Sequence, residues 1–244
     1  MDNQNKTIGS YVTEDYRTAA VFGRYGIDFC CRGNRPLKEV CQQENINYEA
    51  LLEELSQAAA GTITGNDNFS SWPSDLLADY IEKIHHRYVE QSIPRLTGLL
   101  EKVINAHGGR HPEVYEIADH FRISAGELTK HMKKEELVLF PIIRKMANTK
   151  PSSSAIPEAA FGSVANPISV MLQEHDNEGE RFRKIEELSN GYTPPEDACN
   201  TFRVTYELLR EFQQDLHKHI HLENNILFPA AITLEATLRE RKPG

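Results

Sequence analysis

A twelve-residue element that carries histidine and glutamate occurs twice in this chain. The first copy, Lys130–Pro141, reads KHMKKEELVLFP, and the second, Lys218–Pro229, reads KHIHLENNILFP. The copies lie 88 residues apart and share Lys, His, Glu, Leu, Phe and Pro at the same six places. Such a repeat predicts two helices that present the same functional groups.

Each copy contains the pattern His-x-x-x-Glu, formed by His131 with Glu135 and by His219 with Glu223. Residues four apart share a helix face, so imidazole and carboxylate point the same way. The spacing alone is weak evidence for a metal site. Composition predicts roughly one such pair by chance, and three occur in this chain. An exposed pair of this kind would contribute only a few tenths of a kcal/mol to helix stability. The repeated context favours metal binding instead.

Two further helices are expected to supply one histidine each at the same depth. His175 follows His86 by 89 residues, close to the offset of the repeat. Helical periodicity slightly favours the neighbouring His85 as the inward residue, whereas the repeat register favours His86, which we take as the ligand. A hydrogen-bonded core histidine is the alternative for either position. The expected ligands of a two-metal site are His86, His131, Glu135, His175, His219 and Glu223.

The remaining polar candidates are ranked below these six. Glu127, one turn before His131, and Glu174, beside His175, could line an entry path or relay protons, although a solvated glutamate is the commoner outcome. His217 and His221 lie about 200° round the helix from His219 and should point away from the site. Turn or surface positions are expected for His107, His111 and His120.

Cys30 and Cys31 lie in a glycine-bearing turn, Gly26–Asn34. Arginines at positions 24, 32 and 35 should favour the thiolate form of these cysteines. Redox chemistry, metal capture or thiol transfer would suit such a pair. The alternative is a pair of small, buried, apolar residues.

The elements that position these residues are read as helices. Apolar periodicity predicts helices near 75–106, 112–147, 167–189 and 195–239, separated by breaks rich in Gly, Pro, Ser and Asn. Four antiparallel helices make an all-α four-helix bundle. Pro94, Pro141 and Pro229 should kink these helices or mark frayed ends.

A small helical unit is expected before the bundle and should pack on it or on a partner. We divide the chain into a Cys-Cys domain at residues 1–62, a linker at 63–75 and the bundle at 76–244. The 244 residues carry a net charge of −9, which disfavours nucleic-acid binding. No apolar run is long enough to span a membrane and no secretory signal is evident, so we expect a cytoplasmic protein. Four cysteines without a CxxC pair disfavour a four-cysteine zinc site.

The segment Arg24–Cys31, RYGIDFCC, resembles the N-terminal domain of the iron–sulfur cluster repair di-iron proteins, the repair of iron centres family. The bundle resembles the hemerythrin-like domain of that family, through His131-x-x-x-Glu135, Glu174-His175-Asp176 and His219-x-x-x-Glu223-Asn224-Asn225. The resemblance covers nearly the whole chain.

This resemblance implies two non-haem iron ions, with an oxo bridge as one form, held by the six ligands named above and bridged by Glu135 and Glu223. It also implies a cytoplasmic homodimer that responds to nitrosative and oxidative stress and restores damaged iron–sulfur cluster proteins, with nitric oxide or oxygen as small ligands. Glu127 and Glu174 would lie near the centre. Oxygen-carrying hemerythrins use five histidines, so the four here disfavour oxygen carriage. Arg32 replaces the glycine that often follows Cys31 in the family.

Repair by iron donation is therefore the expected function. The alternatives are a nitric oxide or peroxide reductase and an oxygen or nitric oxide sensor, and the sequence leaves open whether the protein is an enzyme.

Overall fold

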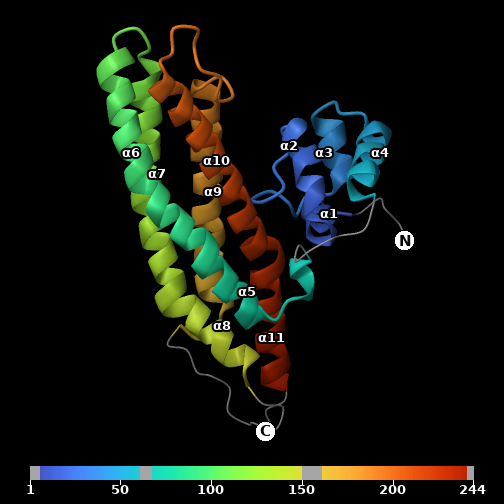
Figure 1. The fold of residues 1–244 in the computed structure, drawn as a ribbon. Coiled ribbons are helices and arrows are strands. Elements are labelled where there is room, and N and C mark those ends of the chain that lie inside the picture. Colours follow the sequence, from blue (N-terminus) through green and yellow to red (C-terminus); the bar gives the residue numbers. More distant parts are fainter. Residues whose placement is uncertain (1–5, 61–67, 150–160, 241–244) are drawn as a thin grey trace.

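The computed structural model describes residues 6–60, 68–149 and 161–240. Within these ranges every regular element is a helix, apart from an isolated antiparallel bridge between Thr7 and Pro36. A long helical bundle forms the body of the molecule, and a small helical unit lies beside it (Figure 1). The all-α fold predicted from the sequence is confirmed. No helix within the described ranges is long and apolar enough to cross a membrane.

The N-terminal unit is built from short helices around one small apolar core. Its elements are α1 (Ile8–Glu14), the 3₁₀ turn η2 (Tyr16–Thr18), α2 (Ala19–Arg24), α3 (Leu37–Gln43) and α4 (Tyr48–Ala59). Side-chain oxygens of Thr7 and Asn47 accept backbone N–H groups at the starts of α1 and α4, which satisfies donors that a helix leaves unpaired. Ile8, Phe22 and Leu37 are fully buried in the core.

Four long helical segments make the bundle, and three of them contain a π-helical stretch. The segments are α5 (Ser74–Tyr80) with η4 (Ile81–His86) and α6 (Arg87–His107); α7 (Glu113–Lys134) with η5 (Glu135–Leu139) and α8 (Phe140–Ala147); α9 (Ala165–Leu188); and α10 (Asn200–Leu222) with η6 (Glu223–Leu227) and α11 (Phe228–Glu240). They agree with the four expected helices except that the last begins at 200, because residues 191–199 form the connection from α9.

The expected linker at 63–75 is only partly described. Residues 63–67 lie outside the described ranges, as do 150–160 of the second expected break. The described end of the linker holds a 3₁₀ turn, η3 (Phe69–Ser71). The buried ring of Phe69 belongs to an apolar cluster with residues of α5, α8, α9 and α11. This end of the linker is therefore part of the packed structure.

Buried residues on α7 and α10 follow one another at alternating spacings of three and four. On α7 they are Val114, Ile117, Phe121, Ser124 and Leu128; on α10 they are Phe202, Thr205, Leu209, Phe212 and Leu216. The next two places in each series are the histidine and glutamate of the repeat. The apolar seam that faces the bundle core therefore also directs these polar side chains inward.

A π-helical stretch begins at each glutamate of the repeat. The backbone N–H of Phe140 donates to the carbonyl of Glu135, five residues earlier, and Phe228 donates to Glu223 in the same way. Pro141 and Pro229 follow directly and have no N–H to donate, so the ordinary helical pattern cannot continue through them. Single π turns of this kind occur frequently at functional sites. Pro94, by contrast, lies inside the continuous helix α6.

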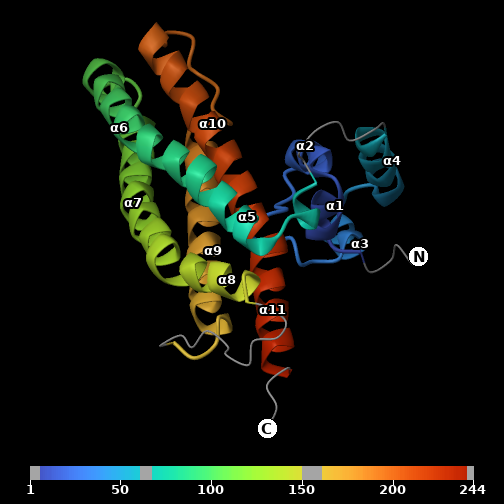
Figure 2. The same cartoon turned by 60° about the horizontal axis from the view of Figure 1, so that its bottom comes forward.

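The N-terminal unit lies beside α10 (Figures 1 and 2), and its residues contact α9, α10 and η6. The Asn224 amide donates to the Cys30 carbonyl at 3.1 Å, and Arg183 donates to Asp28 at 2.8 Å. A Cβ on Gly9 would lie 2.4 Å from Oδ1 of Asn225, so a larger residue here would displace the Asn225 side chain. The expectation that the unit packs on the rest of the chain is confirmed.

Candidate metal centre

Six buried side chains form two overlapping groups of possible metal ligands. One group is His86, Glu135, His219 and Glu223, and the other is His131, Glu135, His175 and Glu223. Within each group the ligand atoms all lie within 4.8 Å of one another. Each of the six residues is at most 3% exposed. The two groups share both glutamates, which is the arrangement of a two-metal carboxylate site in a helical bundle.

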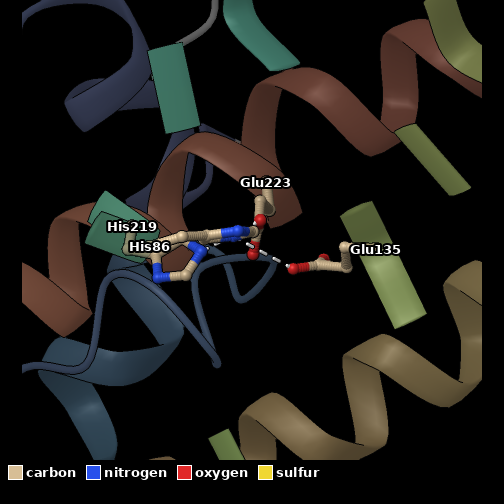
Figure 3. A group of neighbouring side chains, drawn as sticks. All are labelled: His86, Glu135, His219 and Glu223. Atoms are coloured by element: carbon tan, nitrogen blue, oxygen red, sulfur yellow. Dashed lines mark hydrogen bonds and ion pairs between the residues drawn. The ribbon is translucent and has the colours of Figure 1, made fainter. Parts of the chain in front are cut away.

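The histidines are divided evenly between the two carboxylates. His86 Nε2 and His131 Nε2 lie 3.4 and 3.3 Å from Oε2 of Glu135. His175 Nε2 and His219 Nε2 each lie 3.1 Å from an oxygen of Glu223. Figure 3 shows the first group, in which His86, His219 and Glu135 converge on Glu223.

The ring nitrogens of His131 and His175 show that the site suits a cation. Nδ1 of His131 bonds to Glu174 at 2.9 Å, and Nδ1 of His175 bonds to Oδ1 of Asn224 at 2.7 Å. These acceptors hold the proton on Nδ1, which leaves a lone pair on Nε2 in each neutral ring. The two Nε2 atoms are 3.0 Å apart. Two lone pairs at this distance repel unless a proton or a metal ion lies between them.

Carboxylate oxygens of Glu135 and Glu223 that lack hydrogen-bond partners in the described part of the chain also indicate a site for a cation. Neither oxygen of Glu135 has a hydrogen-bond partner among the described atoms, and Oε2 of Glu223 also has none. The Nε2 atoms of the four histidines lie 3.1–3.4 Å from the two carboxylates, and wherever these nitrogens carry no proton, a buried, ionised carboxylate is strongly destabilised in an apolar interior. Coordination by a metal ion would satisfy these oxygens, so the residues present fit a bound metal.

Electrostatics keep the inner carboxylates ionised. Burial and the charge of Glu223 oppose ionisation of Glu135, but His131 and His86 lower its pKa overall. Burial likewise opposes ionisation of Glu223, yet His219 and His175 hold its pKa well below the usual range. Burial also opposes protonation of His131, whereas Glu135 and Glu174 raise its pKa to about 10. Protons on His86 and His131, whose pKa values are both raised, thus balance the carboxylates, and metal ions would displace them.

Side chains outside the two ligand groups bond to Nδ1 of three of the histidines and so orient them. One of these side chains, Glu136, was not expected from the sequence. Nδ1 of His86 bonds to Glu136 at 3.0 Å, as Nδ1 of His175 bonds to Asn224. Glu136 and Asn224 occupy equivalent places in the repeat, each directly after the shared glutamate. A polar residue at this place in both copies was the signal that could have identified Glu136.

His85 and His86 are both buried but have different partners. His86 belongs to the first ligand group, whereas Nδ1 of His85 bonds to Asp215 at 2.9 Å. The ring of His85 stacks on that of His219, with centroids 5.6 Å apart. The structure therefore brings His86, and not His85, to the other ligands.

The other sequence candidates lie in several environments. Glu174 contacts the centre through His131, and this imidazole lowers its pKa to about 2. Glu127 lies apart from the centre; its side chain is 52% exposed and pairs with Lys130. His217 and His221 point away from the ligands and pack against Phe29 of the N-terminal unit.

The surface expectation is wrong for His107. This residue ends α6 and is 6% exposed, because its ring packs against Phe202.

Cys30 and Cys31 lie where the N-terminal unit meets α9. Their sulfurs are 3.6 Å apart, and the Cys31 thiol donates to the His175 carbonyl at 3.4 Å. The neighbouring Cys31, burial and the Asp28 carboxylate raise the pKa of Cys30 well above its usual range. The expected thiolate is therefore wrong for Cys30.

The physical reason is that the nearby cations have other partners. Arg24 pairs with Glu54, and Arg32 pairs with Glu180. Asp28, Cys30 and Cys31 nevertheless form a further group of possible metal ligands.

Two family models match this chain. The model of the domain of unknown function DUF542 matches residues 4–59, and that of the hemerythrin HHE cation binding domain matches residues 78–231. Among curated proteins, the iron-sulfur cluster repair protein YtfE of Pectobacterium atrosepticum is 34% identical over 232 residues, and that of Yersinia pseudotuberculosis is 35% identical over 233. Each comparison covers 95% of this chain and 99% of the relative.

Proposed function

The chain belongs to the hemerythrin HHE cation binding family and to the iron-sulfur cluster repair proteins within it, and from this membership we propose that it repairs damaged iron–sulfur clusters by donating iron. The observation that carries the proposal is the pair of ligand groups that share Glu135 and Glu223. We assign two iron ions to these groups, bridged by the two glutamates. The protein would act in the cytoplasm under nitrosative or oxidative stress.

The ligand set suits iron that must be both held and released. Imidazole and carboxylate together bind divalent iron, manganese or zinc, and availability decides among them. Six protein ligands shared by two ions leave coordination positions free for a small molecule such as nitric oxide or oxygen. The chemistry that bound iron supplies here is reversible ligand exchange. Fewer protein ligands per ion mean that fewer protein bonds must break before an ion leaves.

The protein's own residues control this exchange. Glu136, Glu174 and Asn224 hold the Nδ1 protons of three histidines, which keeps each Nε2 directed at the site. Protons that return to the imidazoles would compete with the metal for the same nitrogens. Release is thereby linked to protonation of the ligands.

The Cys30–Cys31 turn is the proposed first acceptor of the donated ion. Asp28 accepts the backbone N–H groups of both cysteines, at 3.1 and 2.9 Å, and so fixes the turn. Cys31 contacts the backbone of His175, which belongs to the second ligand group. Thiolates bind iron well but must first lose their protons. The raised pKa of Cys30 would keep this acceptor empty until a cation approaches.

The experiment is a transfer assay. Anaerobically prepared, iron-loaded protein is mixed with a [4Fe–4S] dehydratase whose cluster nitric oxide has damaged, and dehydratase activity and iron in both proteins are followed. We expect activity to return in proportion to iron lost from this chain. Glu223→Leu should abolish both effects, whereas Glu235→Gln, which changes a buried glutamate remote from the site, should keep them. Sustained consumption of nitric oxide without loss of iron would instead indicate a reductase.

A further inference from the structure

A separate cluster of metal-ligand side chains lies at the other end of the bundle. It consists of His107 at the end of α6, His111 in the turn before α7 and Asp197 in the connection from α9 to α10, and their ligand atoms lie within 4.8 Å of one another. Both connections lie at the same end of the bundle (Figure 1). His107 follows His86 by 21 residues, which at 1.5 Å per helical residue separates the two places by about 30 Å.

Backbone and aromatic contacts hold the two histidines in place. The N–H of His111 donates to the carbonyl of His107 at 2.9 Å, so the chain completes one helical turn between them. The His107 and His111 rings both pack against Phe202, with centroids 5.2 and 5.7 Å from it. The two imidazoles, with centroids 6.2 Å apart, therefore lie side by side on one apolar wall.

His107 is incompletely satisfied in its surroundings. The residue is 6% exposed, and its Nδ1 has no hydrogen-bond partner among the described atoms. A buried polar atom without a partner destabilises the folded protein. A metal bond at this ring would supply an interaction that the protein atoms do not.

The other two side chains bond to each other inside the cluster, and each also contacts a charged residue outside it, Glu113 for His111 and Arg110 for Asp197. His111 Nε2 donates to Oδ1 of Asp197 at 2.8 Å, and its Nδ1 lies 3.2 Å from Glu113. The other oxygen of Asp197 pairs with Arg110 at 2.9 Å. Outer partners of this kind are typical of metal ligands, because they fix ring orientation and the position of the proton.

We propose that His107, His111 and Asp197 bind a divalent first-row transition-metal ion, at a site separate from the His/Glu centre. Two imidazoles and one carboxylate favour zinc, cobalt or ferrous ions over magnesium and calcium, which prefer oxygen ligands. The metal would take the place of the proton that His111 and Asp197 share. Three protein ligands leave a position for water, and the ion would link the α6–α7 turn to the α9–α10 connection.

Cobalt is the probe that separates this site from the centre. Full-length protein whose His/Glu centre is filled with iron is incubated anaerobically with Co²⁺, desalted, and measured for metal content and visible absorption. We expect about one cobalt per chain with the iron content unchanged, and absorption bands of cobalt bound to nitrogen and oxygen. Zn²⁺ should displace the cobalt and raise the melting temperature.

Two variants at partly exposed ligands and one control test the proposal. The side chains of His111 and Asp197 are 17% and 41% exposed, so His111→Ala and Asp197→Asn should leave the fold intact. Each should weaken cobalt binding about tenfold or more, while His120→Ala, on α7 and outside the cluster, should retain it. The proposal fails if the wild-type protein retains no cobalt, if cobalt replaces iron one for one, or if His111→Ala binds it as tightly.

Discussion

His85 occupies in the first half of the chain the place that Glu174 occupies in the second. Each residue directly precedes a ligand histidine, and the two lie 89 residues apart. Glu174 accepts the Nδ1 proton of His131, whereas His85 stacks on His219, whose Nδ1 has no partner among the described atoms. The repeat is therefore symmetric in its ligands and asymmetric in what orients them.

We expect two metal ions of unequal affinity, because each group has one histidine held by a carboxylate, but Asn224 holds the other histidine of the second group, whereas Nδ1 of His219 in the first has no partner among the described atoms. A carboxylate behind a ligand histidine makes the imidazole a stronger ligand, and its loss typically costs 10–100-fold in metal affinity. We expect Glu174→Ala to weaken the ion at His131 and His175 by about that factor and to change the other ion less. Anaerobic competition with a coloured iron chelator would resolve the two ions. Equal weakening of both would contradict this prediction.

The shared glutamates should be essential for holding both metals. Glu135→Leu or Glu223→Leu removes an oxygen donor from both ligand groups at once, and we expect bound iron to fall well below two per chain. Metal content after anaerobic purification measures this directly. Glu235→Gln serves as the control, since it changes a buried glutamate outside both groups. Two irons retained in both leucine variants would show that the bridging assignment is wrong.

Asn224 should link the metal centre to the N-terminal unit. Its Oδ1 accepts from His175 and its amide donates to the Cys30 carbonyl. We expect Asn224→Ala both to lower iron affinity and to speed alkylation of Cys30. Asn225→Ala is the matched control, because Asn225 contacts the same carbonyl but bonds to His221 instead of a ligand. Alkylation should rise in both variants, and iron affinity should fall only in the first.

Attachment of the Cys30 turn should weaken in acid. Burial raises the pKa of Asp28, but the backbone N–H groups of Cys31 and Arg32 lower it overall. The carboxylate therefore stabilises the fold fully above the unfolded pKa of about 3.9, and this contribution is lost as the pH falls through the lower folded value. Hydrogen exchange of residues 28–33, taken relative to the intrinsic exchange rate at each pH, should accelerate below about pH 4. Asp28→Asn should show the same acceleration at pH 7, with little further change in acid.

Glu235 should stabilise the contact between α11 and the start of α9. Its carboxylate accepts the Ser163 hydroxyl at 2.6 Å and the Val164 N–H at 3.3 Å, which ties α11 to the start of α9. Glu235→Ala leaves these donors unpaired and should lower the free energy of unfolding by about 1–3 kcal/mol. Denaturant unfolding of metal-free protein measures the change. A loss below about 0.5 kcal/mol would mean that water replaces the carboxylate.

The fold was predictable from the sequence because one pattern determines most of it. The alternating three-four spacing on α7 and α10 directs apolar residues inward, and Gly, Pro and Asn mark where the helices end. The same spacing carries His131 and Glu135 inward, so the ligand positions could be inferred with the helices. The start of the last helix was placed five residues early, at 195, because the break that ends at Pro195 was taken to end the connection, which continues to Cys199.

Other features depend on how the helices meet, and the sequence pattern does not contain this information. Glu136 and Asp215 contact their histidines across helix boundaries, and neither contact follows from spacing along one helix. The arginines near Cys30 lie close in sequence, but two of them turn to glutamates elsewhere. The π turns shift the backbone by one residue without changing the apolar pattern, and only Pro141 and Pro229 hinted at them.

The order of the ligands along the chain limits when the centre can form during synthesis. His86, His131 and Glu135 come first, and Glu223 follows Glu135 by 88 residues. Because both ligand groups need Glu223, a nascent chain that ends before this residue has neither group complete. The complete two-metal centre can therefore form only after the first helix pair has been made. Until α10 is made, the inward histidines of that pair face an open core, and they would be the part of the nascent chain most exposed to adventitious metal ions.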